Sequence, residues 1–367
     1  MDGPTDERAG MSVRIGFIGV GSIAASHLAD LVRIPEAEVV ALSDVSPECI
    51  EFARRKVNEA SVRERGSAGP ASEHRPLEAA AYTDYRLMLR NERLDAVYLC
   101  LPPFAHGDPE EAVVEAGLPM LVEKPVSLDL RTSAHILKLV RAKNLTVATG
   151  YQTRYAGYVE RARHLIADRT IGMALATRFG RTPDTSWYHR QDQSGGQMIE
   201  MATHQVDLLR YLVGEVESVY AAAGTRINNK AQPDYDIFDV NCTTMRFDSG
   251  AVANLAVNFV AQLGDPMSGA AVHIFCDGLT VSLGGAGLRA TSAEGVEEVA
   301  SEESPMALED QAFVRAVAED RRDLIKSDYE SGVRTLAVTI ANDRSARTGQ
   351  SVSVSDLLAE EAAILSA

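Results

Sequence analysis

Short apolar runs alternate with helical segments over the first 150 residues, and this alternation constrains the fold more than any other feature. The runs at 13–19, 38–44, 95–102, 119–125 and 145–151 are almost entirely apolar. Such runs are typical of parallel strands that are covered on both faces. The first intervening segment carries side chains at helical spacing, namely Ile23, Ala24, His27, Leu28, Leu31 and Val32. Strand, helix and strand repeated in this order predict an α/β fold with a doubly wound parallel sheet.

Two local features refine this first half of the chain. A helix is predicted with Asp108 as its N-cap, Pro109 in its first turn and Gly117 at its C-terminal end. Residues 61–79 are polar, aperiodic and rich in Gly, Pro and Ser. They predict a mobile surface loop inserted into the sheet domain.

The pattern changes after residue 150. A helix is predicted from Gly157 to Ile166. The run at 253–261 alternates, with Leu255, Val257 and Phe259 on one side, and the runs at 238–247 and 269–285 also read as strands. Alternation indicates a mostly antiparallel sheet with one covered face, so this half is α+β. Helical patterning returns at 306–346, and this segment should pack against one of the domains.

Length and composition limit the protein class. A chain of 367 residues favours two domains, which we place at 12–150 and 151–367 after a loose polar tail at 1–11. The net charge of −16 argues against a nucleic-acid binder. There is no apolar core of a signal peptide, and no run approaches the ~18 residues of a membrane span. The separated cysteines indicate reduced packing residues: Cys49, Cys100, Cys242 and Cys276. We therefore expect a cytoplasmic protein without nucleic-acid or membrane partners.

A glycine-rich turn follows the first strand. Gly19, Gly21 and Ala24 form a G-x-G-x-x-A pattern that ends a strand and opens a helix. Gly19 permits a tight turn, Gly21 lets the backbone approach a pyrophosphate, and Ala24 lets the helix pack close to the strand. Ser22 and Ile23 belong to the same predicted contact. Glycines alone could mark an ordinary turn, but in this context they predict a Rossmann domain that binds a dinucleotide.

An acidic residue ends the next strand. Asp44 lies 23 residues after Gly21, where a carboxylate can accept hydrogen bonds from the adenine-ribose hydroxyls and would repel a 2′-phosphate. Neither Ser43 nor Val45 is basic. The sequence therefore favours NAD over NADP.

Three further segments leave the same edge of the predicted sheet, because ligands of such sheets lie outside the carboxyl ends of the strands. They are "LPPFAH", "EKP" and "GYQTRY", and we expect all three to border the nicotinamide end of the cofactor. For His106 a structural role is the alternative. The candidate cofactor contacts here are Leu101, Pro102, His106, Glu123, Lys124 and Gln152.

A second informative stretch, 194–215, predicts a single helix that ends at Gly214. Glu200 and His204 are four residues apart and Asp207 follows three later, so the three ionisable groups would share one helical face. A solvated helix face is the alternative interpretation. The stretch contains no H-E-x-x-H motif or cysteine pair, so no metal site is predicted.

Taken together, "GVGSIAASH", "EKPVSLD", "GYQTRY" and "GGQMIEMATHQVDLLRYL" resemble the Gfo/Idh/MocA oxidoreductases, the glucose–fructose oxidoreductase and inositol dehydrogenase family. The resemblance covers nearly the whole chain. It implies a Rossmann domain followed by a domain with a large open sheet that often forms oligomer contacts, here a homodimer or homotetramer. It also implies a carbohydrate or polyol substrate.

The resemblance assigns roles to individual residues. Lys124 corresponds to the catalytic lysine at the nicotinamide and His204 to the proton-transferring histidine. The partner four residues before this histidine is usually Asp, and here it is Glu200, whose extra methylene can change its contact. Arg154 corresponds to a position that often contacts the substrate.

The chemistry expected of these residues is the oxidation of a secondary alcohol. NAD would accept the hydride, His204 can take the hydroxyl proton with an ordinary pKa near ~6.5, and Lys124 can stabilise the developing charge on oxygen. Glu200 would orient the imidazolium or bind a substrate hydroxyl. Burial beside a cationic ring should lower the pKa of Lys124, and the sequence leaves open which of Lys124 and His204 is the immediate base.

The sequence leaves two points open, the role of Trp187 and the type of reaction. Trp187 lies in a polar loop, where it either packs in the core or stacks on a sugar ring, with His189 and Arg190 as weaker candidates. The leading function is an NAD-dependent dehydrogenase acting on a sugar, cyclitol or related polyol. The alternatives are redox-neutral chemistry on tightly bound NAD, or a nucleotide-sensing regulator, although a sensor has no chemical need for both Lys124 and His204.

Overall fold

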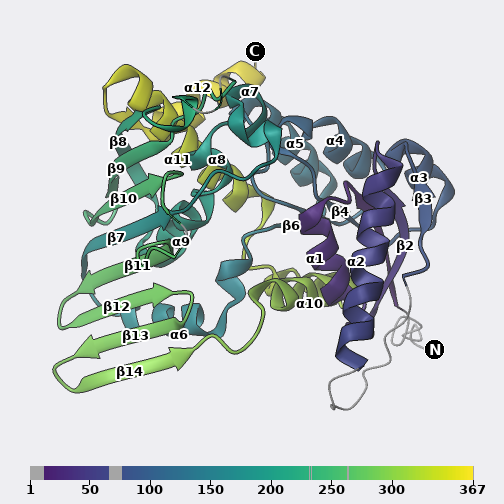
Figure 1. Cartoon of the computed structure of the whole chain (residues 1–367), viewed down its shortest axis with the longest axis horizontal. Helices are drawn as coiled ribbons and strands as arrows, with labels where there is room; N and C mark the ends of the chain where they lie inside the picture. The colour runs from purple at the N-terminus through teal and green to yellow at the C-terminus, as the bar shows by residue number, and fades with distance from the viewer. Residues whose placement is uncertain (1–11, 66–76, 231, 233, 263, 367) are drawn as a thin grey trace, which may run out of the picture.

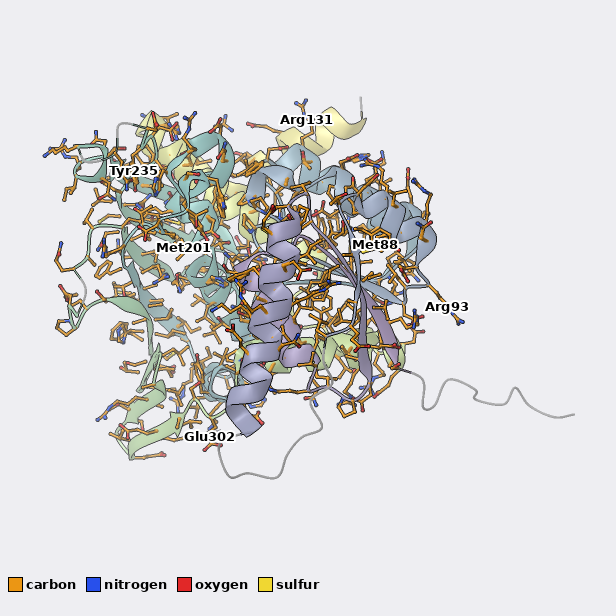
Figure 2. All side chains as sticks on the ribbon, turned by 45° about the vertical axis from the view of Figure 1, so that its right-hand side comes forward. Met88, Arg93, Arg131, Met201, Tyr235 and Glu302 are labelled. Carbon is orange, nitrogen blue, oxygen red and sulfur yellow. The ribbon has the colours of Figure 1, made fainter. Side chains whose placement is uncertain are left out.

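The computed structural model describes residues 12–65, 77–230, 232, 234–262 and 264–366. Two sheets organise them, one in each half of the chain (Figure 1). Figure 2 shows side chains filling both halves, with Met88 in the first and Met201 and Tyr235 in the second. Where the first domain ends remains a prediction.

The first sheet has six parallel strands in the order β3-β2-β1-β4-β5-β6. This is the order of a Rossmann fold, in which ligands bind where the strand order reverses, here between β1 and β4. The predicted doubly wound sheet is confirmed. The strands are β1 (Val13–Ile18), β2 (Ala37–Ser43), β3 (Ala80–Tyr82), β4 (Ala96–Leu99), β5 (Met120–Val122) and β6 (Val147–Thr149).

Helices connect these strands and cover both faces of the sheet (Figure 1). The short edge strand β3 was not predicted, because it has only three residues, none of them buried. The helices are α1 (Ser22–Leu31), α2 (Pro47–Arg65), α3 (Tyr85–Asn91), α4 (Asp108–Glu115) and α5 (Leu130–Lys143), with the short η1 (Pro103–Ala105) and η2 (Gln152–Tyr155).

The second sheet has nine strands in the order β14-β13-β12-β11-β7-β10-β9-β8-β15. Among the described strands of this second sheet, only β7 and β10 pair in parallel, so the predicted, mostly antiparallel sheet is confirmed. The strands are β7 (Ile171–Phe179), β8 (Val216–Gly224), β9 (Val240–Phe247), β10 (Val252–Asn258), β11 (Gly269–Cys276), β12 (Leu279–Gly284), β13 (Gly287–Ser292), β14 (Gly295–Ala300) and β15 (Val352–Ser353).

One face of this sheet is covered by helices (Figure 1). Leu255, Val257 and Phe259 are buried on that face, as their alternation predicted. α6 spans Gly157–Ile166, as expected, and α9 (Thr203–Val213) lies against β7 and β11. The other elements of this half are α7 (Gln191–Ser194), α8 (Gln197–Glu200), α12 (Val354–Ser366), η3 (Ser186–His189), η4 (Asn228–Lys230) and η5 (Arg322–Leu324).

The helical segment at 306–346 does not pack against one domain as predicted. Its first helix, α10 (Pro305–Ala318), packs against α1 and β1 and places Phe313 and Val314 in the core of the Rossmann sheet. Its second helix, α11 (Tyr329–Thr348), packs against β8 of the large sheet and α5 of the Rossmann domain. The end of the chain therefore ties the two sheets together.

Both predicted bounds of the loop at 61–79 are wrong. α2 continues to residue 65, and Leu77 and Ala79 are buried in the Rossmann core. Burial of these two apolar side chains is favourable. The prediction missed them because the residues around them are mostly polar. Residues 66–76 and the tail at 1–11 lie outside the described residues.

The N-terminus of α4 also differs from the prediction. Gly107, and not Asp108, is the N-cap, and its N–H donates to Glu110 Oε2 at 2.7 Å. Asp108 instead accepts hydrogen bonds from Tyr85 and Arg86. Gly117 follows the C-cap, Ala116, with a φ of 73°.

The cysteines differ in exposure. Cys100 is buried, but Cys242 is exposed on β9, so its predicted packing role is wrong. No described helix has the length and apolarity needed to cross a membrane.

Replacing Phe313 by Ala should lower the free energy of unfolding by about 3–5 kcal/mol, because its ring is 1% exposed in the Rossmann core. Phe104→Ala is the matched control, since that ring is 50% exposed. Urea unfolding measures both. Equal, small losses in the two variants would contradict the packing of α10 on the Rossmann domain.

Candidate active site

The turn between β1 and α1 has the geometry required for a pyrophosphate. Gly19 has a φ of 82°, and a side chain there would lie 2.5 Å from the Cys100 carbonyl oxygen. A Cβ at Gly21, in contrast, would meet no atom within 4 Å. Ala24 is fully buried, Ser22 is exposed and Ile23 is partly buried. The turn is therefore packed against β4 on one side and open at Gly21, where the sequence predicted the cofactor phosphates.

Asp44 is fixed by backbone amides. Its Oδ2 accepts from the Val20 N–H and its Oδ1 from the Ser46 N–H, both at 2.9 Å. The carboxylate thus belongs to the glycine turn itself. It lies at the carboxyl end of β2, which is the position that a ribose-binding acid requires.

The ends of β4 and β6 bring two unsatisfied polar atoms to the same edge. His106 Nδ1 lies 2.5 Å from Glu110 Oε1, and its Nε2 is buried without a partner among the described residues. Gln152 Oε1, after β6, is likewise buried and unpartnered within the described chain. Pro102 precedes η1, and Leu101 packs against Gly19. Together with the glycine turn and Asp44, these atoms fit a bound dinucleotide.

Lys124 and Glu200 form an ion pair between the two halves of the chain. Lys124 Nζ donates to Glu200 Oε1 at 2.7 Å and to the Glu200 carbonyl oxygen at 3.0 Å. The two side chains are only 12% and 5% exposed. Burial alone would lower the pKa of Lys124, but Glu200 and Glu123 raise it above its ordinary value. The protein's own carboxylates therefore favour the charged form of Lys124, and the lowering expected beside a bound nicotinamide ring stays a prediction.

The predicted single helix at 194–215 is interrupted twice, and the second break lies at the contact with Lys124. Gly195 and Gly196 have φ of 70° and 86° and separate α7 from α8. In a continuous helix the Glu200 carbonyl would accept from the N–H four residues later, but here it accepts from Lys124. α9 then starts afresh at Thr203. Glu200 thus faces Lys124 and not His204, so the predicted shared helical face is wrong.

His204 lies on the first turn of α9, with its ring edge-on to Tyr151 at 6.0 Å between centroids. Its Nδ1 is buried without a hydrogen-bond partner among the described residues. Burial and the charge of Lys124 lower the pKa of His204 to about 3, well below the ordinary value expected from sequence. The imidazole is therefore neutral at physiological pH, and its Nδ1 has no hydrogen-bond partner among the described residues.

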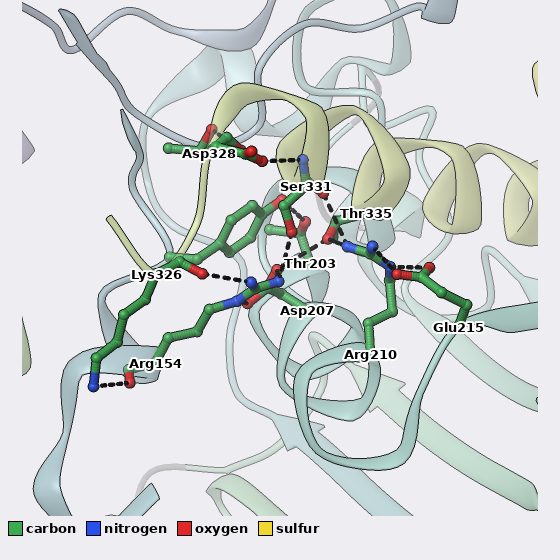
Figure 3. A network of polar contacts seen from close by, with 11 residues as sticks. Arg154, Thr203, Asp207, Arg210, Glu215, Lys326, Asp328, Ser331 and Thr335 are labelled. Atoms are coloured by element: carbon green, nitrogen blue, oxygen red, sulfur yellow. Dashed lines mark hydrogen bonds and ion pairs between the residues drawn. The ribbon is translucent and has the colours of Figure 1, made fainter. Parts of the chain in front are cut away.

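The guanidinium of Arg154 is held by hydrogen bonds to other residues of the protein (Figure 3). Its guanidinium donates to both carboxylate oxygens of Asp207, at 2.7 and 2.6 Å, and to the Lys326 carbonyl and Ser331. All three guanidinium nitrogens are engaged, and the residue is 5% exposed. The geometry thus favours a structural role over the substrate contact implied by the resemblance, and Asp207 is its partner.

Trp187 joins the site through a residue that the sequence did not single out. Its ring stacks on Tyr188 at 3.9 Å, and Tyr188 Oη donates to Glu200 Oε1 at 3.2 Å. Glu200 Oε2 has no partner among the described residues. Its position next to the only tryptophan, in a polar loop, is the feature of the sequence that could have identified Tyr188. His189 donates to the Pro183 carbonyl and Arg190 pairs with Asp192.

Glu123 belongs to a buried cluster behind the site. His27 on α1 lies 3.2 Å from Glu123 and 2.7 Å from Asp310 on α10. Burial alone would lower the pKa of His27, but these two carboxylates raise it well above its ordinary value. Glu123 also accepts from the Lys124 N–H. These contacts hold Lys124 and α1 in place, and the predicted contact of Glu123 with the cofactor stays a prediction.

The described residues contain no group of three or more His, Cys, Asp and Glu side chains suited to a metal.

Comparison with known proteins agrees with this geometry. Residues 13–151 match an oxidoreductase family with an NAD-binding Rossmann fold, and residues 159–281 match the GFO/IDH/MocA C-terminal domain. The chain is 26% identical to a myo-inositol 2-dehydrogenase of Thermotoga maritima over 65% of its own length and 66% of that enzyme, just under two thirds. It is 28% identical to an inositol 2-dehydrogenase of Rhizobium meliloti over 69% of this chain and 71% of that one.

A levoglucosan dehydrogenase solved with NADH and levoglucosan has the same fold. Its TM-score is 0.79 at 20% identity, over 94% of this chain and all of that one. The strand order of the first sheet, the second sheet and the matches to both domains lead to one conclusion. The chain belongs to the Gfo/Idh/MocA family of oxidoreductases.

Proposed function

We propose that the protein is an NAD-dependent dehydrogenase that oxidises a secondary alcohol of a sugar, cyclitol or related polyol, or reduces the corresponding ketone. The observation that carries this proposal is the pairing of Lys124 with Glu200 beside a neutral His204, at the carboxyl edge of the Rossmann sheet. The inositol dehydrogenases among its relatives support the substrate class.

The residues divide the chemistry between them. Bound NAD supplies the hydride acceptor. Lys124, kept protonated by Glu200, can donate a hydrogen bond to the reacting oxygen and stabilise negative charge there. His204, kept neutral by burial and by the Lys124 charge, can accept the hydroxyl proton. Because Lys124 is already protonated and cannot take this proton, we assign His204 as the immediate base.

Glu200 has two functions in this scheme. Its Oε1 holds Lys124, and its unpartnered Oε2 can accept a hydrogen bond from a substrate hydroxyl. Tyr188 and Trp187 extend the site on the side of the second domain. An aromatic face of this kind suits the C–H face of a sugar ring.

Lys124→Met and His204→Gln should each lower kcat by roughly 10²- to 10⁴-fold, because each removes a group that acts on the reacting oxygen or its proton. NAD affinity should change less than about 3-fold, since the phosphates are expected at the glycine turn and both residues at the nicotinamide end. NADH absorbance and cofactor titration measure the two quantities. The matched controls are Lys138→Met and His164→Gln, which are exposed and should behave as wild type.

The same variants test the charge coupling. Above pH ~4 His204 should stay neutral in the wild type, so its protonation should not limit kcat/KM between about pH 5 and 8. Loss of the Lys124 cation should raise the pKa of His204, which NMR of the imidazole ring follows. Full activity in either variant, or an unchanged His204 pKa in Lys124→Met, would contradict the assigned mechanism. Turnover without NADH accumulation would point to redox-neutral chemistry on bound NAD.

We also propose NAD over NADP as the cofactor, based on the carboxylate of Asp44. Asp44→Asn removes the charge but keeps an oxygen that can accept the Val20 N–H, whereas Asp44→Ala loses both. We expect Asp44→Asn to lower the preference for NAD over NADP about 10-fold or more. Asp44→Ala should additionally weaken both cofactors. An unchanged preference in Asp44→Asn would refute this role.

The uncovered face of the nine-stranded sheet is the proposed contact of a homodimer or homotetramer. Val252, Met173 and Phe275 lie side by side on β10, β7 and β11, and they are 38%, 39% and 38% exposed. Leu175 and Tyr220 on the same sheet are also exposed. An exposed apolar row of this kind is typical of a protein–protein contact.

The double variant Met173→Lys/Phe275→Lys should therefore dissociate the oligomer, because it places charges in the apolar row. Light scattering coupled to gel filtration measures the mass. Ile227→Lys is the control, since Ile227 is 52% exposed in a loop outside the sheet. A monomeric wild type at micromolar concentration, or an unchanged mass in the double variant, would contradict the proposal.

A further inference from the structure

Arg178 is placed at the edge of the candidate active site. It lies near the end of β7, two residues after Ala176 and four after Ala174, both buried on the face that α9 covers. Because side chains alternate along a strand, Arg178 is on that same face. Its neighbours on the flanking strands are Val257 and Ala270.

The elements around Arg178 carry the reacting groups. α9, which holds His204, lies against β7, and α8, which holds Glu200, lies against the adjacent strand β10. The charge of Arg178 acts on the pKa values of Lys124 and His204, lowering both, and Glu200 acts on that of Arg178. Arg178 therefore faces the same space as these three residues.

The guanidinium of Arg178 has neither a hydrogen bond nor an ion pair with any residue that the structure describes. Burial lowers its pKa, with Glu200 opposing the shift, but a guanidinium remains charged in proteins. The buried arginines elsewhere differ: Arg154 forms a bidentate pair with Asp207, and Arg210 pairs with Glu215 and Thr335 (Figure 3). A half-buried charge without such a partner is costly unless a ligand supplies one.

The nearby acid does not supply that partner. Glu200 Oε1 is taken by Lys124 and Tyr188, and no distance between Glu200 and Arg178 falls within ion-pair range. Glu123 is held by His27 and the Lys124 amide. The site thus has one positive charge beyond the Lys124–Glu200 pair, although the whole chain carries −16.

We propose that Arg178 binds a carboxylate of the substrate, so that the enzyme acts on sugar acids or other polyol acids in preference to neutral polyols. This inference rests on the proposed dehydrogenase function. A guanidinium presents two parallel N–H donors that match the two oxygens of a carboxylate. One unpaired cation matches a monoanion, whereas a phosphate dianion beside Glu200 would leave negative charge uncompensated.

The test compares matched pairs of ligands that differ in one group: glucuronate with glucose, galacturonate with galactose, and gluconate with glucitol. Each is titrated into the protein–NADH complex and then assayed for NADH formation with NAD. In the wild type, at least one acid should bind roughly 10- to 100-fold more tightly than its neutral partner. In Arg178→Met this preference should disappear, while the neutral partner changes less than about 3-fold.

Arg178→Lys, which keeps the charge but loses the two parallel N–H donors, should retain part of the preference for the acid. It also serves if Arg178→Met fails to fold, which circular dichroism detects. The proposal is overturned if no acid binds more tightly than its partner, if glucose 6-phosphate binds more tightly than glucuronate, or if Arg178→Met weakens acid and neutral ligands equally. Turnover of the neutral sugars without any acid preference would overturn this inference alone, whereas the absence of NADH formation from every ligand would count against the dehydrogenase itself.

Discussion

The ion pair between Lys124 and Glu200 is the interaction on which the rest of the site depends. It joins the end of β5 in the Rossmann domain to the end of α8 in the second domain. Two buried charges cost desolvation energy unless further hydrogen bonds satisfy them, and here Tyr188 supplies one to Glu200. Lys124 also donates a hydrogen bond to the Glu200 carbonyl oxygen, at the point where α8 ends. The new helix α9 then begins in the position that brings His204 to the site.

The electrostatics of the site follow from this pair. The carboxylates around Lys124 raise its pKa, and the resulting positive charge, with burial, lowers the pKa of His204. A donor that stays protonated and an acceptor that stays neutral are thus produced by one arrangement. Dehydrogenation requires both states at the same pH, since one group must stabilise the oxygen while the other removes its proton.

A layer of buried polar contacts supports the site from behind. His27 connects α1 to Glu123 on one side and to Asp310 of α10 on the other. Arg154 and Asp207 connect η2 and α9 to the start of α11 (Figure 3). The helices α10 and α11 therefore return to both domains. Breaking either network would leave a buried charge unpaired, which is why these contacts fix the elements that carry Lys124 and His204.

The sequence alone determined the Rossmann sheet, the glycine turn, Asp44 and the alternation of β10, because periodicity and turn residues act over short distances along the chain. It also brought out Lys124, Glu200 and His204, through their resemblance to a family pattern. Only the tertiary structure decided their pairing. Glu200 turns to Lys124 and not to His204, Arg154 is engaged by Asp207, and Arg178, absent from every motif, faces the site. Desolvation and ion pairing depend on distance in space, and spacing along a sequence does not contain that distance.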